Sequence, residues 1–149
     1  MNRVFVDTGG FYAALNRRDA FHREAARLFR RAQQDHWFLF TTNFVLAESH
    51  ALILARLGRD QAWHFLQALL TGSTNVVRVD AADERRARAI IEHYADKSFS
   101  YCDAVSFAVM ERLDLQEAIA FDDHYRRVWC ARAATNASTR GTTSSQWRS

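Results

Sequence analysis

The sequence predicts an α/β fold with a largely parallel central sheet and helices on both of its faces. Short, continuously apolar runs, the pattern of buried strands, alternate along the chain with longer segments whose apolar residues recur at helical spacing. No proline interrupts this alternation. Strands joined by helical crossovers pair in parallel, because each connection returns the chain to the same edge of the sheet.

The first half of the chain is expected to contain two strands and four helices. The first strand covers residues 4–6, and Gly9 and Gly10 then break it before a short helix at 11–15. Asp19 is expected to cap the second helix. The other elements are helix 20–34, strand 37–40, helix 43–57 with Thr41 or Thr42 as its cap and Gly58 at its end, and helix 60–70, which ends near Gly72.

The second half continues the alternation and ends in a segment of different composition. A strand at 76–79 leads to a helix that runs from Asp80 to about residue 95, and a helix at 100–113 precedes a strand at 118–121. From residue 133 onward the chain is rich in Ala, Thr, Asn, Ser and Gly, with Trp147 as its one large apolar residue. We therefore expect a domain at 1–132 and a polar, disordered tail at 133–149.

The composition is that of one globular domain. The chain has 149 residues, of which 48% are hydrophobic and 13% aromatic, and this excludes a disordered chain. The apolar run after Arg3 is too short for a signal peptide, and no stretch approaches membrane-spanning length, so we expect a cytoplasmic protein without membrane association. Cys102 and Cys130 lack zinc-site or disulfide spacing and are interpreted as small core residues.

The charge of the chain is weak evidence for nucleic-acid binding. Of the 20 Lys and Arg residues two lie in the tail, Arg140 and Arg148, whereas all 17 acids precede it, so the body is nearly neutral. Every cation except Lys97 is an arginine, the residue suited to forked phosphate contacts. Genome composition explains this richness in arginine equally well.

Two acids follow expected strands directly. Asp7 comes after the strand at 4–6, and Asp122 comes after the strand at 118–121. Ligands and reacting groups gather at the carboxyl ends of parallel strands, so an acid there is well placed to act. The competing interpretation is that Asp122 or its neighbour Asp123 caps the following turn.

Two more acids lie on expected helices. Glu48 shares an apolar stripe with Phe44, Leu52 and Ala55, and a carboxylate there is costly unless it is paired, hydrogen-bonded or bound to metal. An ion pair with an arginine is the structural alternative. Asp103 forms a Ser-x-x-Asp pattern that resembles a capping box, which alone explains it. The similar pair of Asp80 and Asp83 is interpreted as structural.

Taken together, the four acids indicate a metal site. If Asp7, Glu48, Asp103 and Asp122 converge on one pocket, they repel one another unless protons or cations neutralise them. Mg²⁺ or Mn²⁺ is the expected cation, because no His or Cys cluster is present to select zinc. Such a site can activate water and stabilise an in-line phosphoryl displacement.

Four segments in this order resemble the motifs of PIN-domain ribonucleases, and more narrowly those of VapC-type toxins of toxin–antitoxin pairs. They are Val-Phe-Val-Asp-Thr ending at Thr8, Asn-Phe-Val-Leu-Ala-Glu ending at Glu48, Phe-Ser-Tyr-Cys-Asp ending at Asp103 and continuing to Ser106, and Ala-Phe-Asp-Asp-His-Tyr around Asp122. The resemblance covers about residues 3–129, and the ordered set is more specific than any one motif. Family members commonly add a short strand after the fourth acid, whereas here a polar tail follows residues 128–130.

The resemblance implies a three-layer α/β/α sandwich and cleavage of RNA that depends on Mg²⁺ or Mn²⁺. It also implies a homodimer and a cognate antitoxin that blocks the site. By position, the catalytic and metal-binding quartet would be Asp7, Glu48, Asp103 and Asp122. Three further side chains would orient these ligands without binding the metal directly: Thr8, Ser106 and Asp123.

Three functions compete on the sequence alone. The leading hypothesis is a metal-dependent endoribonuclease acting as a toxin, in which arginines outside the pocket guide the RNA backbone. A phospho-acceptor signalling domain also places acids at strand ends around Mg²⁺, but it needs a lysine beside them, and Lys97 lies in a loop. The third is a module that binds RNA or a protein partner without cutting.

Overall fold

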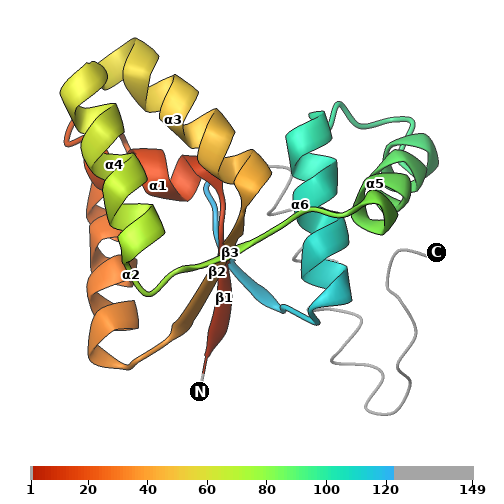
Figure 1. Cartoon of the computed structure of the whole chain (residues 1–149), viewed down its shortest axis with the longest axis horizontal. Coiled ribbons are helices and arrows are strands. Elements are labelled where there is room, and N and C mark those ends of the chain that lie inside the picture. The colour runs from red at the N-terminus through yellow and green to blue at the C-terminus, as the bar shows by residue number, and fades with distance from the viewer. Residues whose placement is uncertain (1, 123–149) are drawn as a thin grey trace.

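A four-stranded parallel sheet forms the centre of the molecule (Figure 1). The computed structural model describes residues 2–122. The strands are β1 (Arg3–Val6), β2 (Phe38–Thr42), β3 (Asn75–Val77) and β4 (Glu117–Ile119), in the spatial order β3-β2-β1-β4. Each neighbouring pair is parallel, as the alternation of strands and helices predicts.

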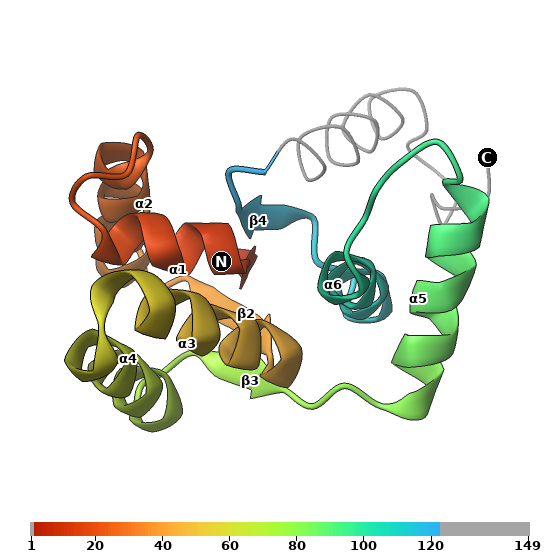
Figure 2. The same ribbon diagram turned by 90° about the horizontal axis from the view of Figure 1, so that it is seen from above.

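Helices cover both faces of the sheet and complete three layers, as Figure 2 shows. The helices α1, α2, α3 and α4 lie on one side, and α5 and α6 lie on the other. The expected α/β/α sandwich is therefore confirmed. The six helices are α1 (Thr8–Leu15), α2 (His22–Gln34), α3 (Asn43–Leu57), α4 (Arg59–Thr71), α5 (Ala81–His93) and α6 (Tyr101–Arg112).

The order of the strands places a switch in chain direction next to β1. From β1 the chain moves outward through β2 to β3, and it then crosses back to add β4 on the free side of β1. In open α/β sheets the crevice at such a switch, outside the carboxyl ends of the strands, is where ligands bind. The first and last acids of the sequence motif set follow these two strands.

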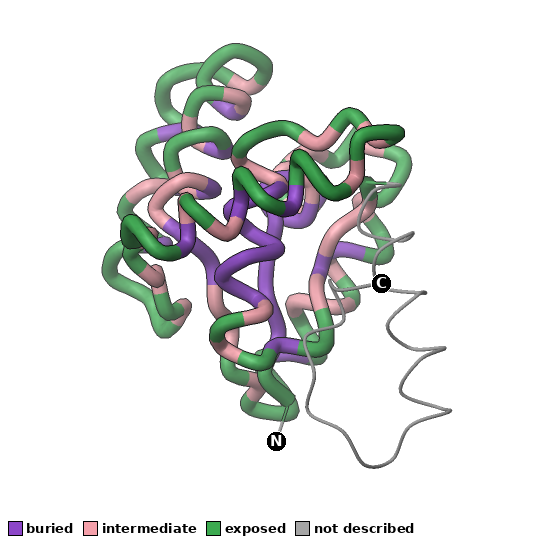
Figure 3. Tube along the Cα trace, turned by 90° about the vertical axis from the view of Figure 1, so that its right-hand side faces the viewer, coloured by how far each residue is buried: buried purple, intermediate pink, exposed green. Residues whose placement is uncertain are grey.

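The core contains β1 and the middle of α6, which is buried on all of its faces. Val4, Phe5 and Val6 are buried, and so is every residue of α6 from Ala104 to Met110. Figure 3 shows the buried segments in the middle of the molecule and the exposed ones on the outer helices. α6 is apolar all round because it lies between the sheet and α5, so it is a rigid support for the acid near its N-terminus.

The glycines after β1 lie inside a helix, which the sequence interpretation missed. We expected Gly9 and Gly10 to precede a helix at 11–15, but α1 begins at Thr8 and contains both of them. A methyl group on Gly10 would overlap the carbonyl oxygen of Ile119. Gly10 therefore serves close packing of α1 against β4, and does not break the chain.

Other boundaries differ from expectation by a few residues. α2 begins at His22, because the Asp19 carboxylate accepts the Phe21 N–H at 2.8 Å in a turn ahead of the helix. β2 extends to Thr42, where strand 37–40 was expected. β3 covers residues 75–77, where a strand at 76–79 was predicted, and β4 covers 117–119, where a strand at 118–121 was predicted. Both strands are thus shorter than predicted and start one residue earlier.

Hydroxyl and carboxylate caps fix the starts of three helices. Thr42, and not Thr41, caps α3 by accepting the Val45 N–H at 3.1 Å, whereas Thr41 donates to the Val6 carbonyl at 2.9 Å. The capping boxes expected at the starts of α5 and α6 are both present. These caps hold the first turns of the helices against the carboxyl edge of the sheet.

Asp83 is structural, as predicted, and joins α5 to α6. Its buried carboxylate accepts two hydrogen bonds from Arg112, at 2.7 and 2.9 Å. Burial raises the pKa of Asp83, but the hydrogen bonds from Arg112 and Asp80 and the charge of Arg112 together outweigh it and hold that pKa below the usual value. Along the described chain no helix is long and apolar enough to cross a membrane. The predicted tail at 133–149 lies outside the described residues, as do Asp123 and Cys130.

Candidate active site

Asp7 lies at the junction of β1 and α1, where its backbone is held from both sides. Its N–H donates to the Ile119 carbonyl of β4 at 3.2 Å, and its own carbonyl accepts the Phe11 N–H at 3.1 Å. The residue is only 4% exposed. It occupies the N-cap position of α1, where the helix dipole favours negative charge. A charged side chain is thus fixed at the switch between β1 and β4, as the sequence predicts.

Glu48 lies in α3 but not in a buried stripe, so that part of the sequence argument is wrong. The buried residues of α3 are Val45, Ser49 and Ile53, and Glu48 is exposed. α3 therefore turns the face that carries Val45, Ser49 and Ile53 inward. Glu48 instead lies close enough to Cys102 of α6 for its carboxylate to raise the pKa of that thiol. Figures 1 and 2 both show the first turns of α3 beside α6.

Asp103 is held by the capping box that starts α6. The Ser100 hydroxyl accepts the Asp103 N–H at 3.0 Å, and the Ser100 N–H donates back to the Asp103 carboxylate at 3.4 Å. Burial raises the pKa of Asp103, and the Ser100 bonds oppose this. The carboxylates of Asp122 and Glu48 raise that pKa further, which means that two of the other acids act on Asp103.

Asp122 lies farther from its strand than expected. β4 ends at Ile119, so two residues separate the strand from this acid, which is exposed. Phe121, just before it, stacks on Phe21 with ring centroids 4.9 Å apart and an interplanar angle of 6°. This contact fixes the path of the chain as it enters the site. The position of the Asp122 side chain relative to Asp103 is therefore set by the short loop after β4 and not by the strand itself.

The pKa of the Cys102 thiol indicates which acids lie near it. Burial, with the Glu48 and Asp7 carboxylates, raises the pKa of its thiol far above the usual value, and Asp103 adds to the effect. Cys102 packs against the hydrophobic core, as expected, but it is only partly buried and it also lies close to the acids. Asp7, Glu48 and Asp103 therefore all lie close enough to Cys102 to act on its thiol, and Asp122 and Glu48 lie close enough to Asp103 to act on its carboxyl.

The arginine alternative for Glu48 finds no support in the described residues. Over residues 2–122 the ion pairs engage other acids, and neither Glu48 nor Asp103 takes part in one. These pairs are Arg31–Asp35, Arg86–Glu111, Lys97–Asp96 and Arg112–Asp83. Within residues 2–122, no guanidinium group forms an ion pair with Glu48 or Asp103.

The donor set fits a hard divalent cation that keeps part of its water shell. Carboxylate oxygens are the ligands that Mg²⁺ and Mn²⁺ prefer. In the part of the chain that is described, no three His, Cys, Asp or Glu side chains are close enough to enclose an ion. Mg²⁺ usually retains several waters and binds through one or two carboxylates, so these acids suit it without forming a closed cage.

Three buried hydroxyls near the acids have no hydrogen-bond partner within the described residues. They are those of Thr8, Ser49 and Ser106. Each follows a site acid in sequence, Thr8 after Asp7, Ser49 after Glu48, and Ser106 one turn after Asp103. A buried hydroxyl without a partner is uncommon, and such a group can donate to a ligating carboxylate or to bound water. Ser49 was not anticipated, because the helix face had been misassigned.

An aromatic pair borders the acids on the same two helices. The rings of Phe44 and Tyr101 lie 6.0 Å apart between centroids, at 59°, and the Tyr101 hydroxyl donates to Glu84 at 2.7 Å. This hydrogen bond, first among several causes, raises the pKa of Tyr101. Tyr101 was not among the predicted site residues, because its position next to Phe44 depends on α3 lying beside α6.

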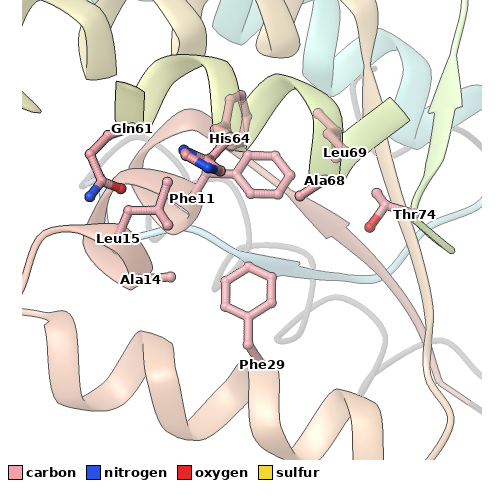
Figure 4. A pocket seen from close by; sticks show the side chains of 10 residues that line it. Phe11, Ala14, Leu15, Phe29, Gln61, His64, Ala68, Leu69 and Thr74 are labelled. Carbon is pink, nitrogen blue, oxygen red and sulfur yellow. The ribbon is translucent and has the colours of Figure 1, made fainter. Parts of the chain in front are cut away.

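A separate cavity of about 360 Å³ lies between α1, α2 and α4 (Figure 4). Its wall is mainly apolar, with Phe11, Phe29, Phe65 and Leu69 among the lining side chains. None of the four acids lines it. The cavity is therefore separate from the acidic cluster.

The fold and the acids at its sheet edge define a PIN domain, and the chain belongs to that family. The sequence pattern of the PIN domain matches residues 4–129. Its relatives include VapC proteins: the 23S rRNA-specific endonuclease VapC20 of Mycobacterium tuberculosis is 35% identical over 123 residues, which are 82% of this chain and 91% of the relative. A VapC ribonuclease of Archaeoglobus fulgidus is 31% identical over 125 residues, 82% of this chain and 78% of that protein.

Solved structures agree with this assignment. The crystal structure of M. tuberculosis VapC20, a toxin that cleaves the sarcin–ricin loop, matches with a TM-score of 0.77 at 32% identity, over 83% of this chain and 93% of the other. VapBC2 from Rickettsia felis, bound to a DNA fragment from its promoter, matches with a TM-score of 0.60 at 12% identity, over 84% and 92%. The second likeness concerns the fold alone. The resemblance to VapC-type PIN domains is confirmed.

Proposed function

We propose that this chain is a metal-dependent endoribonuclease that acts as the toxin of a toxin–antitoxin pair. One observation supports the proposal: Asp7, Glu48 and Asp103 come from three separate segments and each acts on the half-buried Cys102 thiol, while Asp122 acts on Asp103. Their mutual approach is supported by the raised pKa values of Asp103 and Cys102. Membership in a family with named ribonucleases supports the reaction class. An RNA substrate places this activity in the cytoplasm.

In this proposal, Asp7, Glu48, Asp103 and Asp122 hold one or two Mg²⁺ or Mn²⁺ ions, directly or through water. When bound, such an ion supplies a water of lowered pKa and offsets the charge of the phosphate. Asp7 provides the most rigid oxygens, since its backbone is bonded to both β4 and α1. The Thr8 and Ser106 hydroxyls are available to orient the ligating carboxylates. Asp123 was predicted to help, and it lies outside the described residues.

Cleavage is expected to require a divalent cation. Purified protein incubated with RNA in Mg²⁺ or Mn²⁺ should produce discrete fragments, and excess EDTA should abolish them, because the acids repel the phosphate when no cation is present. Restoring Mg²⁺ should restore the fragments. Fragments that form equally well in EDTA contradict the metal-dependent mechanism.

The choice of RNA can be tested in the same assay. Because VapC20 is named for its action on 23S rRNA, we propose the sarcin–ricin hairpin of ribosomal RNA as the first substrate to examine. Transfer RNA and messenger RNA serve as comparisons.

The signalling alternative loses support at Lys97. A phospho-acceptor site needs a lysine beside its acids, but the Lys97 ammonium pairs with Asp96 at 3.4 Å in the segment between α5 and α6. A module that binds RNA without cutting remains the rival hypothesis, and turnover in the cleavage assay separates it from the proposal.

The expected partners are a cognate antitoxin and a second copy of this chain. The apolar cavity between α1, α2 and α4 offers a place away from the acids where a partner's side chains would be buried. An antitoxin gene is expected immediately upstream, and co-expression with its product should yield a stable complex that no longer cuts RNA. Light scattering of the toxin alone should give about twice 17.2 kDa. Independent proteins, or a mass equal to one chain, contradict these two expectations.

A further inference from the structure

We propose that Tyr101 stacks on a base of the RNA next to the phosphate that is cut. This inference rests on the proposed function and adds a substrate-positioning residue to it. The Tyr101 side chain is 41% exposed at the first position of α6. Tyr101 begins the helix that carries Cys102 and Asp103, and its ring contacts Phe44 of α3, one helical turn before Glu48.

Two contacts across the gap between α3 and α6 locate the ring. Glu48 of α3 meets Cys102 of α6, and Phe44 of α3 meets Tyr101 of α6. Phe44 and Glu48 are four residues apart and therefore share one face of α3, separated by about 6 Å. The aromatic pair thus lies one helical turn from the carboxylates, which is close enough for a nucleotide to contact both.

The ring is held in place before any ligand arrives. Phe44 packs against one part of it, at a centroid distance of 6.0 Å, and the hydroxyl donates to Glu84 at 2.7 Å. Both ends of the side chain are therefore fixed, while a large part of it faces solvent. A rigid, exposed aromatic residue loses little conformational entropy when a base stacks on it.

The charge next to Tyr101 suits a nucleic acid. Arg88, one turn beyond Glu84 on α5, is exposed and lies close enough to act on the Tyr101 hydroxyl. A guanidinium there is positioned to contact a phosphate of the same strand. Base stacking on an aromatic ring requires an unpaired base, so we infer that the enzyme selects single-stranded or looped RNA at this position.

The test compares Tyr101→Leu with Tyr101→Phe in steady-state cleavage of a looped RNA substrate. The leucine variant keeps an apolar side chain but has no π face, and we expect its KM to rise by about 5- to 100-fold with kcat changed far less. The phenylalanine variant keeps the ring and should remain within about 3-fold of the wild type. Phe38→Leu is the matched control, because Phe38 is 48% exposed at the start of β2, on the opposite edge of the sheet.

A second readout measures binding without turnover. In an Asp7→Asn background with Mg²⁺, a looped RNA carrying 2-aminopurine should show fluorescence quenching that Tyr101→Leu removes and Tyr101→Phe retains. If the wild type cuts RNA but the leucine variant has an unchanged KM and unchanged quenching, the stacking inference is overturned and the nuclease proposal stands. If the wild type cuts no RNA, the nuclease proposal falls and this inference falls with it. A phenylalanine variant as impaired as the leucine variant also overturns stacking, since it would assign the effect to the hydroxyl.

Discussion

Replacing Asp7 by asparagine is expected to reduce the rate of RNA cleavage by about 100- to 1,000-fold, the size of effect seen when one charge-stabilising group is removed from an active site. The amide has nearly the same volume as the carboxylate, so the packing at the start of α1 should be retained. The loss of a negative charge at the most rigidly held position of the cluster should weaken cation binding. Single-turnover cleavage in saturating Mg²⁺ measures the effect.

Asp35→Asn is the matched control for this prediction. Asp35 is an exposed acid whose carboxylate pairs with Arg31 at 3.2 Å, and it precedes β2 on the edge of the sheet opposite the site. Its replacement should leave cleavage unchanged. If Asp7→Asn cuts RNA as fast as the control, and both variants are folded by circular dichroism, then the carboxylate of Asp7 has no part in the reaction.

Gly10→Ala is expected to destabilise the fold by about 1–3 kcal/mol, as overpacking of a close contact typically does. The added methyl group would overlap the backbone of Ile119, which cannot move aside as a flexible side chain would. Relief requires α1 to shift away from β4. Since the Asp7 N–H bonds to Ile119 in the same place, cleavage should decrease together with stability.

Gly9→Ala provides the comparison on the same helix. A methyl group on Gly9 would come no closer than 3.9 Å to the Phe121 nitrogen, an ordinary contact. Alanine in place of glycine restricts the unfolded chain, so this variant should be as stable as the wild type or more stable by about 0.4–1 kcal/mol. Urea unfolding measures both variants. Equal destabilisation by the two substitutions would show that close packing of α1 on β4 is not what requires a glycine.

The architecture was predictable because it follows from local patterns. Apolar runs without polar alternation specify buried parallel strands, and the Ser-x-x-Asp and Asp-x-x-Asp patterns at Ser100 and Asp80 specify the starts of two helices. The Gly9–Gly10 pair shows the limit of such rules. Glycine predicts a break from backbone freedom alone, whereas the requirement at Gly10 comes from Ile119, which is more than 100 residues away in the chain.

The positions of the candidate acids in the fold were partly predictable from the sequence, whereas their spatial arrangement was not. A position after a strand correctly located Asp7, and a helix cap correctly located Asp103. Glu48 was selected for burial that it does not have, because helical periodicity alone does not say which of two adjacent faces meets the sheet. Cys102 and Tyr101 carried no such pattern, since their importance depends on α3 lying beside α6.

The central claim is that these four acids bind a divalent cation, and anomalous diffraction from crystals soaked in Mn²⁺ tests it most directly. We expect an anomalous peak at the carboxyl edge of the sheet, bonded to the carboxylate of Asp7 and to at least one of Glu48, Asp103 and Asp122, with water completing the coordination. A fully occupied peak elsewhere with none among these acids, at Mn²⁺ concentrations that support cleavage, would contradict the account.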